Sequence, residues 1–230
     1  MQARFSLGLC LFAVLVIVSE SSVALAQATK KPPERVSGTA KIEALVPPDG
    51  FQIKLKEETF LLKFKKKTPP RVTGTATFDL LKPGHSMQFN AMFNKKTGQV
   101  RDPVKKFILY TECAEFTPGV FEDTLVKVGP DDDPAYSPYV VSGQVKNVRG
   151  QTVLLSVPGV GATVKVEVAE NAKIDLNIDD ISVVQPGDSI TLSRADKDPK
   201  NPKNVNLSLG TIKLAKPLSA PSKQAKKPGR

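Results

Sequence analysis

One short phrase occurs twice in this chain and restricts its fold more than any other feature. Residues 80–89 read LLKPGHSMQF, and residues 183–192 read VVQPGDSITL. Each has two aliphatic residues, a Pro-Gly turn signal, a serine and then alternating apolar and polar residues, which is typical of a turn leading into a half-buried strand. The recurrence indicates two duplicated domains rather than a solenoid, which would need more and shorter repeats.

Two further landmarks recur in the same order. The tripeptide VSG occurs at residues 36–38 and again at 141–143. An Asp-Pro or Asn-Pro pair precedes an apolar run at residues 102–103 and 201–202. The spacing between the copies drifts slightly from one landmark to the next, which indicates loop insertions.

Each copy contains five candidate strands with period-two alternation, and Pro and Gly clusters separate them. A longer connection before the fourth strand is expected to form a turn of helix or a buried coil. This order predicts an all-β, OB-like Greek-key barrel. The candidate strands are 36–46, 51–56, 60–67, 86–93 and 104–111 in the first copy, and 139–149, 152–157, 162–169, 188–195 and 204–214 in the second.

The VSG strand and the Pro-Gly turn resemble those of small secreted OB-fold-like β-barrel domains of unknown function in bacteria. The resemblance implies two tandem five-stranded barrels, at residues 36–117 and 139–216, and it supplies no catalytic residues. The segment between them, residues 118–138, is an acidic linker rich in Pro and Asp.

The repeated motifs have structural roles in this interpretation. A first strand that curls across the barrel needs a position without a Cβ, and Gly38 and Gly143 are expected to occupy equivalent positions there. Proline sets φ for the first turn position and glycine accepts positive φ at the second. These turn residues are Pro83 and Gly84 in the first copy, and Pro186 and Gly187 in the second, where Asp188 is expected to accept a backbone N–H.

The N-terminus predicts export. Arg4 precedes the apolar run of residues 9–18, and Ala24-Leu25-Ala26 fits a signal-peptidase site. Residues 1–26 are therefore interpreted as a signal peptide of a secreted or periplasmic protein, with an uncleaved anchor as the alternative. A short basic segment, residues 27–35, follows.

The sequence indicates no catalytic residue, metal or cofactor. Cleavage leaves a single cysteine, Cys113, which excludes a disulfide within the chain; a buried hydrophobic role is favoured over a reactive thiol or an intermolecular disulfide. His85 is the only histidine and occupies the turn position that Asp188 holds in the other copy. The aspartate-rich stretches do not match the spacing of a calcium-binding loop.

The net charge of +10 lies mainly in the first copy and the two tails. Residues 217–230 are expected to form a disordered basic tail that can touch anionic polymers or membrane surfaces. Alternation on two neighbouring strands points four lysines outward as a candidate binding face, with a merely solubilising surface as the alternative. The four are Lys54, Lys56, Lys63 and Lys65.

These features favour an exported, noncatalytic binding or structural module whose partner is an anionic envelope or matrix polymer, or another protein. Nucleic-acid binding is the first alternative, but the chain has no Trp and only three Tyr to stack on bases. An enzyme with a carboxylate-based site is the second alternative, and no pair of carboxylates has a diagnostic spacing.

Overall fold

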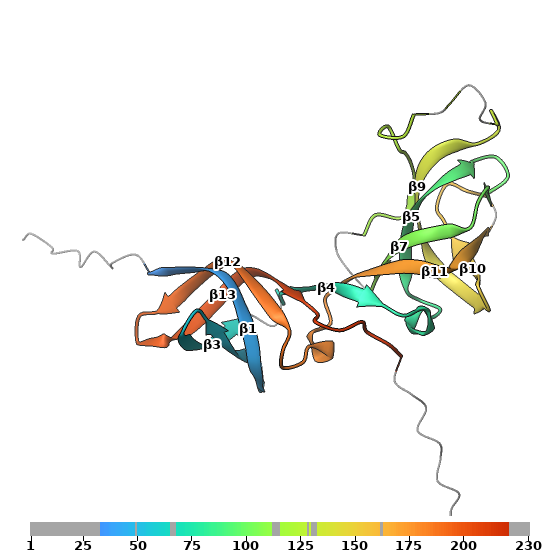
Figure 1. Ribbon diagram of the computed structural model, residues 1–230. Helices are drawn as coiled ribbons and strands as arrows, with labels where there is room; N and C mark the ends of the chain where they lie inside the picture. The colour runs from blue at the N-terminus through green and yellow to red at the C-terminus, as the bar shows by residue number, and fades with distance from the viewer. Residues whose placement is uncertain are drawn as a thin grey trace, which may run out of the picture. The chain divides into compact units, whose positions relative to one another are not determined.

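The computed structural model describes residues 33–220, except residues 49, 65–67, 112–115, 128, 130–132 and 162. The expectations for the signal peptide, Lys65, Cys113 and the end of the basic tail lie outside the described residues. Within that range the fold is all-β, as predicted, with two short 3-10 helices, η1 (Phe78–Leu80) and η2 (Ile181–Val183) (Figure 1).

The strands follow the alternating stretches of the sequence. In β2, for example, Phe51 and Ile53 are buried, whereas Gln52 and Lys54 are exposed. The strands are β1 (Arg35–Val46), β2 (Gly50–Leu55), β3 (Glu58–Phe64), β4 (Arg71–Ala76), β5 (Ser86–Asn94), β6 (Gln99–Val100), β7 (Val104–Tyr110), β8 (Gly119–Glu122), β9 (Ser137–Arg149), β10 (Thr152–Ser156), β11 (Val164–Ile178), β12 (Ser189–Asp198) and β13 (Asn201–Lys213).

Five strands form a closed barrel. Antiparallel pairings join β12 to β1, β1 to β2 and β2 to β3, and β13 closes the circuit by pairing in parallel with β3 and antiparallel with β12. Closure leaves none of these strands with an unpaired edge along its whole length. This closed barrel is compatible with the OB-like resemblance.

A second circuit of five strands has the same pattern of pairing. β9 pairs with β10, β10 with β11, β11 in parallel with β7, β7 with β5, and β5 with β9. The β5–β7 contact covers only three residues of each strand, 86–88 against 108–110. We call this circuit the second ring; β6 and β8 pair at its margins.

The two circuits combine strands from both sequence copies. The closed barrel takes β1–β3 from the first copy and β12–β13 from the second, whereas the second ring takes β9–β11 from the second copy and β5 and β7 from the first. The groups of paired strands therefore do not coincide with the segments 36–117 and 139–216 expected from the sequence. Because both copies have the same alternation, the last two strands of either can cover the first three of the other.

The connections before the fourth strand of each copy are more regular than expected. Residues 71–76 form β4, which pairs antiparallel with β11 and in parallel with β13. In the second copy, β11 continues to Ile178 instead of ending near residue 169, because Ile174, Leu176 and Ile178 keep alternating inward. β4 is followed by η1 and β11 by η2, and each of these 3-10 helices precedes a Pro-Gly turn.

Each Pro-Gly turn attaches one copy to the first strand of the other. Gly84 N donates to Val145 O at 2.9 Å, and Val145 N donates to His85 O at 2.8 Å. In the second copy the same two bonds join Gly187 and Asp188 to Ile42, each at 2.8 Å. Gly84 and Gly187 have φ of 94° and 102°, which favours glycine. The repeated phrase thus makes the same pair of backbone hydrogen bonds in both directions of the exchange.

Gly38 and Gly143 do not occupy equivalent positions. Gly143 pairs with Met87, whose counterpart in the repeat is Ile190, and Ile190 pairs with Ala40 rather than Gly38. Gly38 lies at a register shift in β1 with φ of 128°. The two glycines therefore meet different requirements: Gly38 allows a bulge in β1, and Gly143 allows β9 to approach the end of β10 closely.

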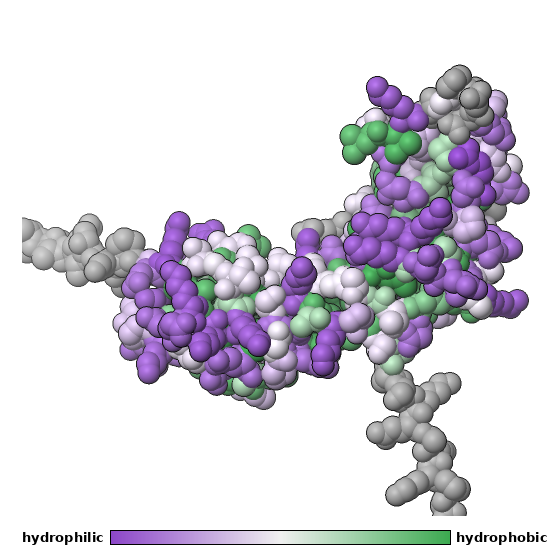
Figure 2. Space-filling view, in the orientation of Figure 1, coloured by the Kyte–Doolittle hydropathy of each residue, from purple (hydrophilic) through white to green (hydrophobic). Residues whose placement is uncertain are grey.

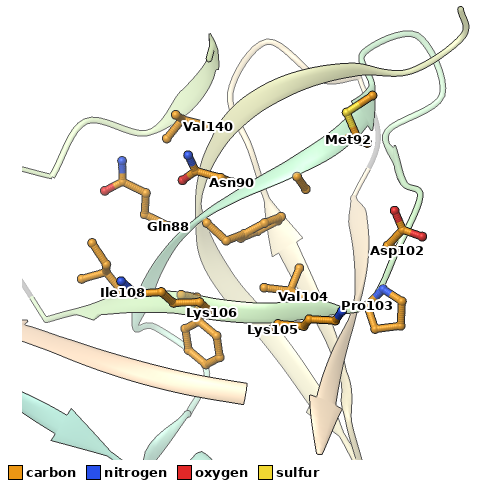
Figure 3. A pocket seen from close by; sticks show the side chains of 13 residues that line it. Gln88, Asn90, Met92, Asp102, Pro103, Val104, Lys105, Lys106, Ile108 and Val140 are labelled. Carbon is orange, nitrogen blue, oxygen red and sulfur yellow. The ribbon is translucent and has the colours of Figure 1, made fainter. Parts of the chain in front are cut away.

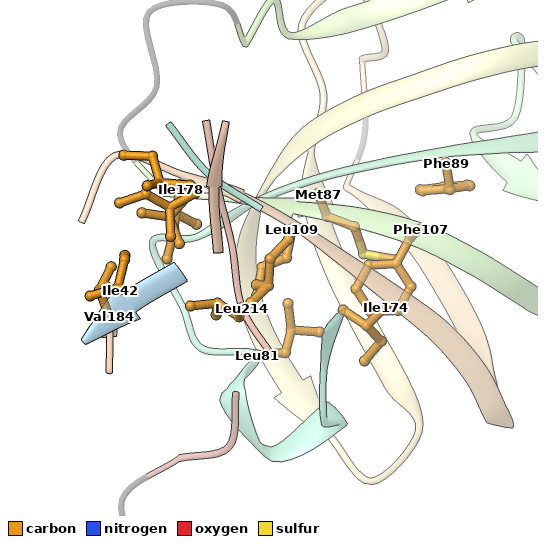
Figure 4. Packing of buried hydrophobic residues seen from close by; sticks show 14 of the residues in the cluster. Ile42, Leu81, Met87, Phe89, Phe107, Leu109, Ile174, Ile178, Val184 and Leu214 are labelled. Atoms are coloured by element: carbon orange, nitrogen blue, oxygen red, sulfur yellow. The ribbon is translucent and has the colours of Figure 1, made fainter. Parts of the chain in front are cut away.

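The core reflects the exchange directly. Met87, Phe107 and Leu109 from the first copy group with Ile174 from the second (Figure 4). All four side chains are at most 3% exposed. Complete burial of such a side chain contributes about 1.5–3 kcal/mol relative to exposure, so each copy supplies stabilisation that the other depends on.

Candidate binding face

The alternation of β2 and β3 points Lys54 and Lys63 away from the interior of the closed barrel. Lys54 follows the buried Ile53, and Lys63 lies between the buried Leu62 and Phe64. Hydrophilic side chains cover much of the surface over β1 and β3 in Figure 2. These two predicted lysines therefore share the outer surface of the barrel.

Strand register brings Lys54 together with lysines from other strands. Lys54 pairs directly with Lys41 of β1, Lys41 pairs with Ser189 of β12, and Ser189 pairs with Lys213 of β13. All three lysines are exposed. Neighbouring strands lie about 4.8 Å apart, so the row crosses four adjacent strands over roughly 15 Å of barrel surface. We call Lys41, Lys54 and Lys213 the lysine row.

A row of hydroxyl groups lies beside the lysine row, two residues away on three of the same strands. Thr39 of β1 pairs with Thr191 of β12, which pairs with Thr211 of β13. The hydroxyl oxygens of Thr39 and Thr191 are 3.2 Å apart and hydrogen bonded. Hydroxyl groups donate hydrogen bonds to anions without adding charge, so the two rows together present cations and neutral donors.

The lysine row carries unpaired positive charge. No ion pair between described residues involves Lys41, Lys54 or Lys213, and the nearest carboxylate along β1, that of the exposed Glu43, accepts a hydrogen bond from Gln52 instead. By contrast, Lys165 of β11 is 2.9 Å from the carboxylate of Glu167 on the same strand. Like charges directly opposite each other on a sheet destabilise it, and an anion bound to Lys41 and Lys54 would relieve that repulsion.

The other predicted lysines lie apart from the row. Lys63 pairs with Gly50 of β2 and with Asn206 of β13. Lys54 pairs with Thr59, which lies four residues from Lys63 along β3. At about 3.3 Å per residue this places Lys63 roughly 13 Å farther along the strand. Lys56 lies in the β2–β3 turn with a φ of 56°, directly before two glutamates.

Lys41 and Lys213 belong to the candidate face but were not predicted from the sequence. Lys41 lies between the buried Ala40 and Ile42, so its alternation pattern is readable in the sequence. Lys213 also alternates with buried residues, but only the exchange of β12 and β13 brings it into register with the lysines of β1 and β2. No local pattern indicates that placement.

Asp188 and His85 occupy corresponding turn positions in different surroundings. Asp188 is buried, and its carboxylate accepts the backbone N–H groups of Gln185 at 2.7 Å and Ala215 at 2.8 Å. His85 is partly buried, and its Nδ1 is buried without a hydrogen-bond partner. Burial, reinforced by the positive charge of Lys82, lowers the pKa of His85 from its ordinary value of 6.5.

The described part of the chain contains neither a candidate metal site nor a membrane-spanning helix. Its His, Cys, Asp and Glu side chains form no group of three or more that could hold a metal ion. Its helices include none that is both long and apolar enough to span a membrane.

Comparison with known proteins adds no relative: the sequence matches no protein-family model and no curated protein, and the structure matches no solved structure.

Proposed function

We propose that this protein is an exported, noncatalytic binding protein whose closed barrel holds an anionic polymer of the cell envelope or extracellular matrix. The observation that carries the proposal is the lysine row, in which three exposed lysines on β2, β1 and β13 are aligned by register and none forms an ion pair with a described residue. Export is inferred from the signal-peptide pattern of residues 1–26.

The chemistry of the two rows suits a repeating anion. Each ammonium group forms charge-assisted hydrogen bonds to carboxylate, sulfate or phosphate oxygens, and the adjacent threonines donate neutral hydrogen bonds. A polymer with regularly spaced charges can contact several strands at once, whereas a single small anion would contact one or two lysines. Binding would release counter-ions and relieve the repulsion between Lys41 and Lys54.

The strand order supports an OB-like interpretation of both circuits. In each, the third strand pairs in parallel with the last, and the fourth strand returns beside the first. OB folds bind oligonucleotides and oligosaccharides on the face of their second and third strands. In the closed barrel these are β2 and β3, which carry Lys54 and Lys63.

The face favours a nonaromatic polyanion over single-stranded nucleic acid. Stacking platforms need exposed aromatic rings beside the cations. Phe51, Phe60 and Phe64 of β2 and β3 are buried inside the closed barrel, and neither row contains an aromatic residue.

Neutralising the row tests the proposal. We expect the double variant Lys41→Gln/Lys54→Gln to bind immobilised dextran sulfate or polygalacturonate at least about tenfold more weakly at low salt. Its log-affinity should also fall less steeply with log salt, by roughly one unit per lost contact. Unfolding free energy should stay the same or rise slightly, because two facing cations are removed.

The matched control is Lys165→Gln, an exposed strand lysine whose charge is already balanced by Glu167. It should leave the affinity and its salt dependence unchanged. If the double variant binds both polymers as tightly as the unaltered protein at every salt concentration, the lysine row is a solubilising surface and the proposal fails.

A further inference from the structure

The second ring contains an opening that the closed barrel does not have. β5 and β7 pair only at residues 86–88 and 108–110, and they separate beyond Gln88 and Ile108 (Figure 3). The corresponding strands of the closed barrel, β12 and β13, pair from Ser189 and Lys213 to Asp198 and Asn201. The same topology therefore allows complete pairing, and the opening is particular to β5 and β7.

The sequence between the two strands explains why they separate. A turn at residues 95–98 returns the chain as β6, which pairs with the end of β5 for two residues. A bend at residues 101–102 then leads to Pro103, which has no N–H to continue the ladder. β7 consequently starts beside β11, where Val104 pairs with Val168.

We call the opening between residues 89–92 of β5 and residues 104–107 of β7 the slot. Its cavity has a volume of about 740 Å³, and both walls are strand edges. The backbone N–H and C=O groups of successive residues in a strand point to opposite edges. Those of Asn90 therefore point to the same edge of β5 as those of Gln88, and those of Lys106 to the same edge of β7 as those of Ile108. Because Gln88 and Ile108 pair across the ring, the backbone groups of Asn90 and Lys106 face each other across the slot.

The surroundings of the slot indicate the chemistry of an occupant. Lys105 lies on the wall and is exposed, whereas the wall carboxylate of Asp102 is held by Arg101 at 3.0 Å. Asn90 donates to Asp123 at 2.6 Å and so ties the slot to the loop after β8. That loop exposes 93% of Leu125 and 48% of Val126, and an apolar group stands out there in Figure 2.

We propose that the slot binds an extended segment of a partner protein that alternates apolar and acidic residues. The segment adds a strand between β5 and β7, antiparallel to one and parallel to the other, and its backbone bonds to Asn90 and Lys106. Its carboxylates interact with Lys105, and its apolar side chains contact the loop of Leu125 and Val126. This site is separate from the lysine row and independent of the polymer proposal.

The test uses the full chain without its signal peptide and the synthetic hexapeptide acetyl-Val-Glu-Val-Glu-Val-Glu-amide. We expect the peptide to shift the backbone amide resonances of Asn90 and Lys106 and to slow their hydrogen exchange. A peptide of the same sequence with alternate amide nitrogens methylated should not bind, because methylation removes the donors of one edge. Lys105→Glu should weaken binding about threefold to tenfold at low salt.

The control variant is Lys203→Glu, which reverses an exposed lysine on β13 of the closed barrel. It should bind the hexapeptide like the unaltered protein. The proposal is overturned if millimolar peptide leaves the Asn90 and Lys106 amides unperturbed, if the methylated peptide binds equally well, or if Lys105→Glu and Lys203→Glu have equal effects.

Discussion

At the scale of single residues, His85 gives the molecule a pH dependence that can be isolated. Burial and the nearby Lys82 lower its pKa below 6.5 in the folded state. As pH falls through the unfolded pKa, the unfolded chain takes up the proton first, so the free energy of unfolding decreases. His85→Gln should therefore remove part of the stability loss between pH 7.5 and 5.5, measured by denaturant unfolding at both values.

The assignment is unambiguous because the chain has one histidine, and carboxylates titrate mainly at lower pH. Polymer binding by the variant at pH 7.5 should be unchanged, since His85 is remote from the lysine row in strand register. An identical pH slope for the variant and the unaltered protein would show that His85 does not contribute.

Residue orientations were largely predictable, because alternation depends on local sequence alone. The inward positions of Ile53 and Leu62 and the outward positions of Lys54 and Lys63 follow from it. Lys56 differs since β2 ends one residue earlier and the turn takes it out of the alternation. Which lysines become neighbours depends on the register between strands, and a single sequence does not indicate the register between strands that are distant along the chain.

At the scale of elements, Gly143 shows how β9 approaches the end of β10. A Cβ at Gly143 would lie 2.7 Å from Val157 Cγ2 and 2.8 Å from the backbone oxygen of Ser156. The backbone oxygen cannot turn aside as a flexible side chain can, so Gly143→Ala should destabilise the protein by about 1–3 kcal/mol in denaturant unfolding. Gly161→Ala is the control, because its Cβ would meet no atom within 4 Å and its φ is not positive.

The ten candidate strands all correspond to observed strands, because Pro and Gly clusters and period-two alternation mark them locally. β4, β6, β8 and the later part of β11 were not predicted as strands, and β8 lies in the segment expected to be a linker. β4 and the later part of β11 lie in connections whose apolar residues suit a buried coil as well as a strand, and their mutual pairing, Val72 with Ile178 through Ala76 with Ile174, defines them. That pairing joins residues from different copies, so neither segment alone indicates it.

At the scale of the whole molecule, the exchange of strands was beyond prediction for a physical reason. Alternation identifies the side of a strand that faces a core, but it does not identify the neighbouring strand. Both copies present equivalent inward faces, so the sequence is equally consistent with two self-contained barrels and with reciprocal exchange. The observed pairings predict that neither copy folds independently, since each circuit needs two strands from the other copy.

Cleavage of the linker distinguishes the two architectures in the intact protein. A specific protease site inserted after Leu125, in the exposed loop following β8, allows the folded chain to be cut between the copies. With exchanged strands, the two pieces should co-elute in size-exclusion chromatography without denaturant and separate only when unfolded, because the cut leaves both circuits complete.

A cross-link provides the complementary evidence. Thr39 and Thr191 face each other across β1 and β12, so Thr39→Cys/Thr191→Cys in a Cys113→Ser background should form a disulfide that holds the cut pieces together under denaturing, nonreducing conditions. Two self-contained barrels would instead yield separately eluting folded pieces and no such disulfide. That outcome would also remove Lys213 from the lysine row, because β13 reaches the face only through the exchange.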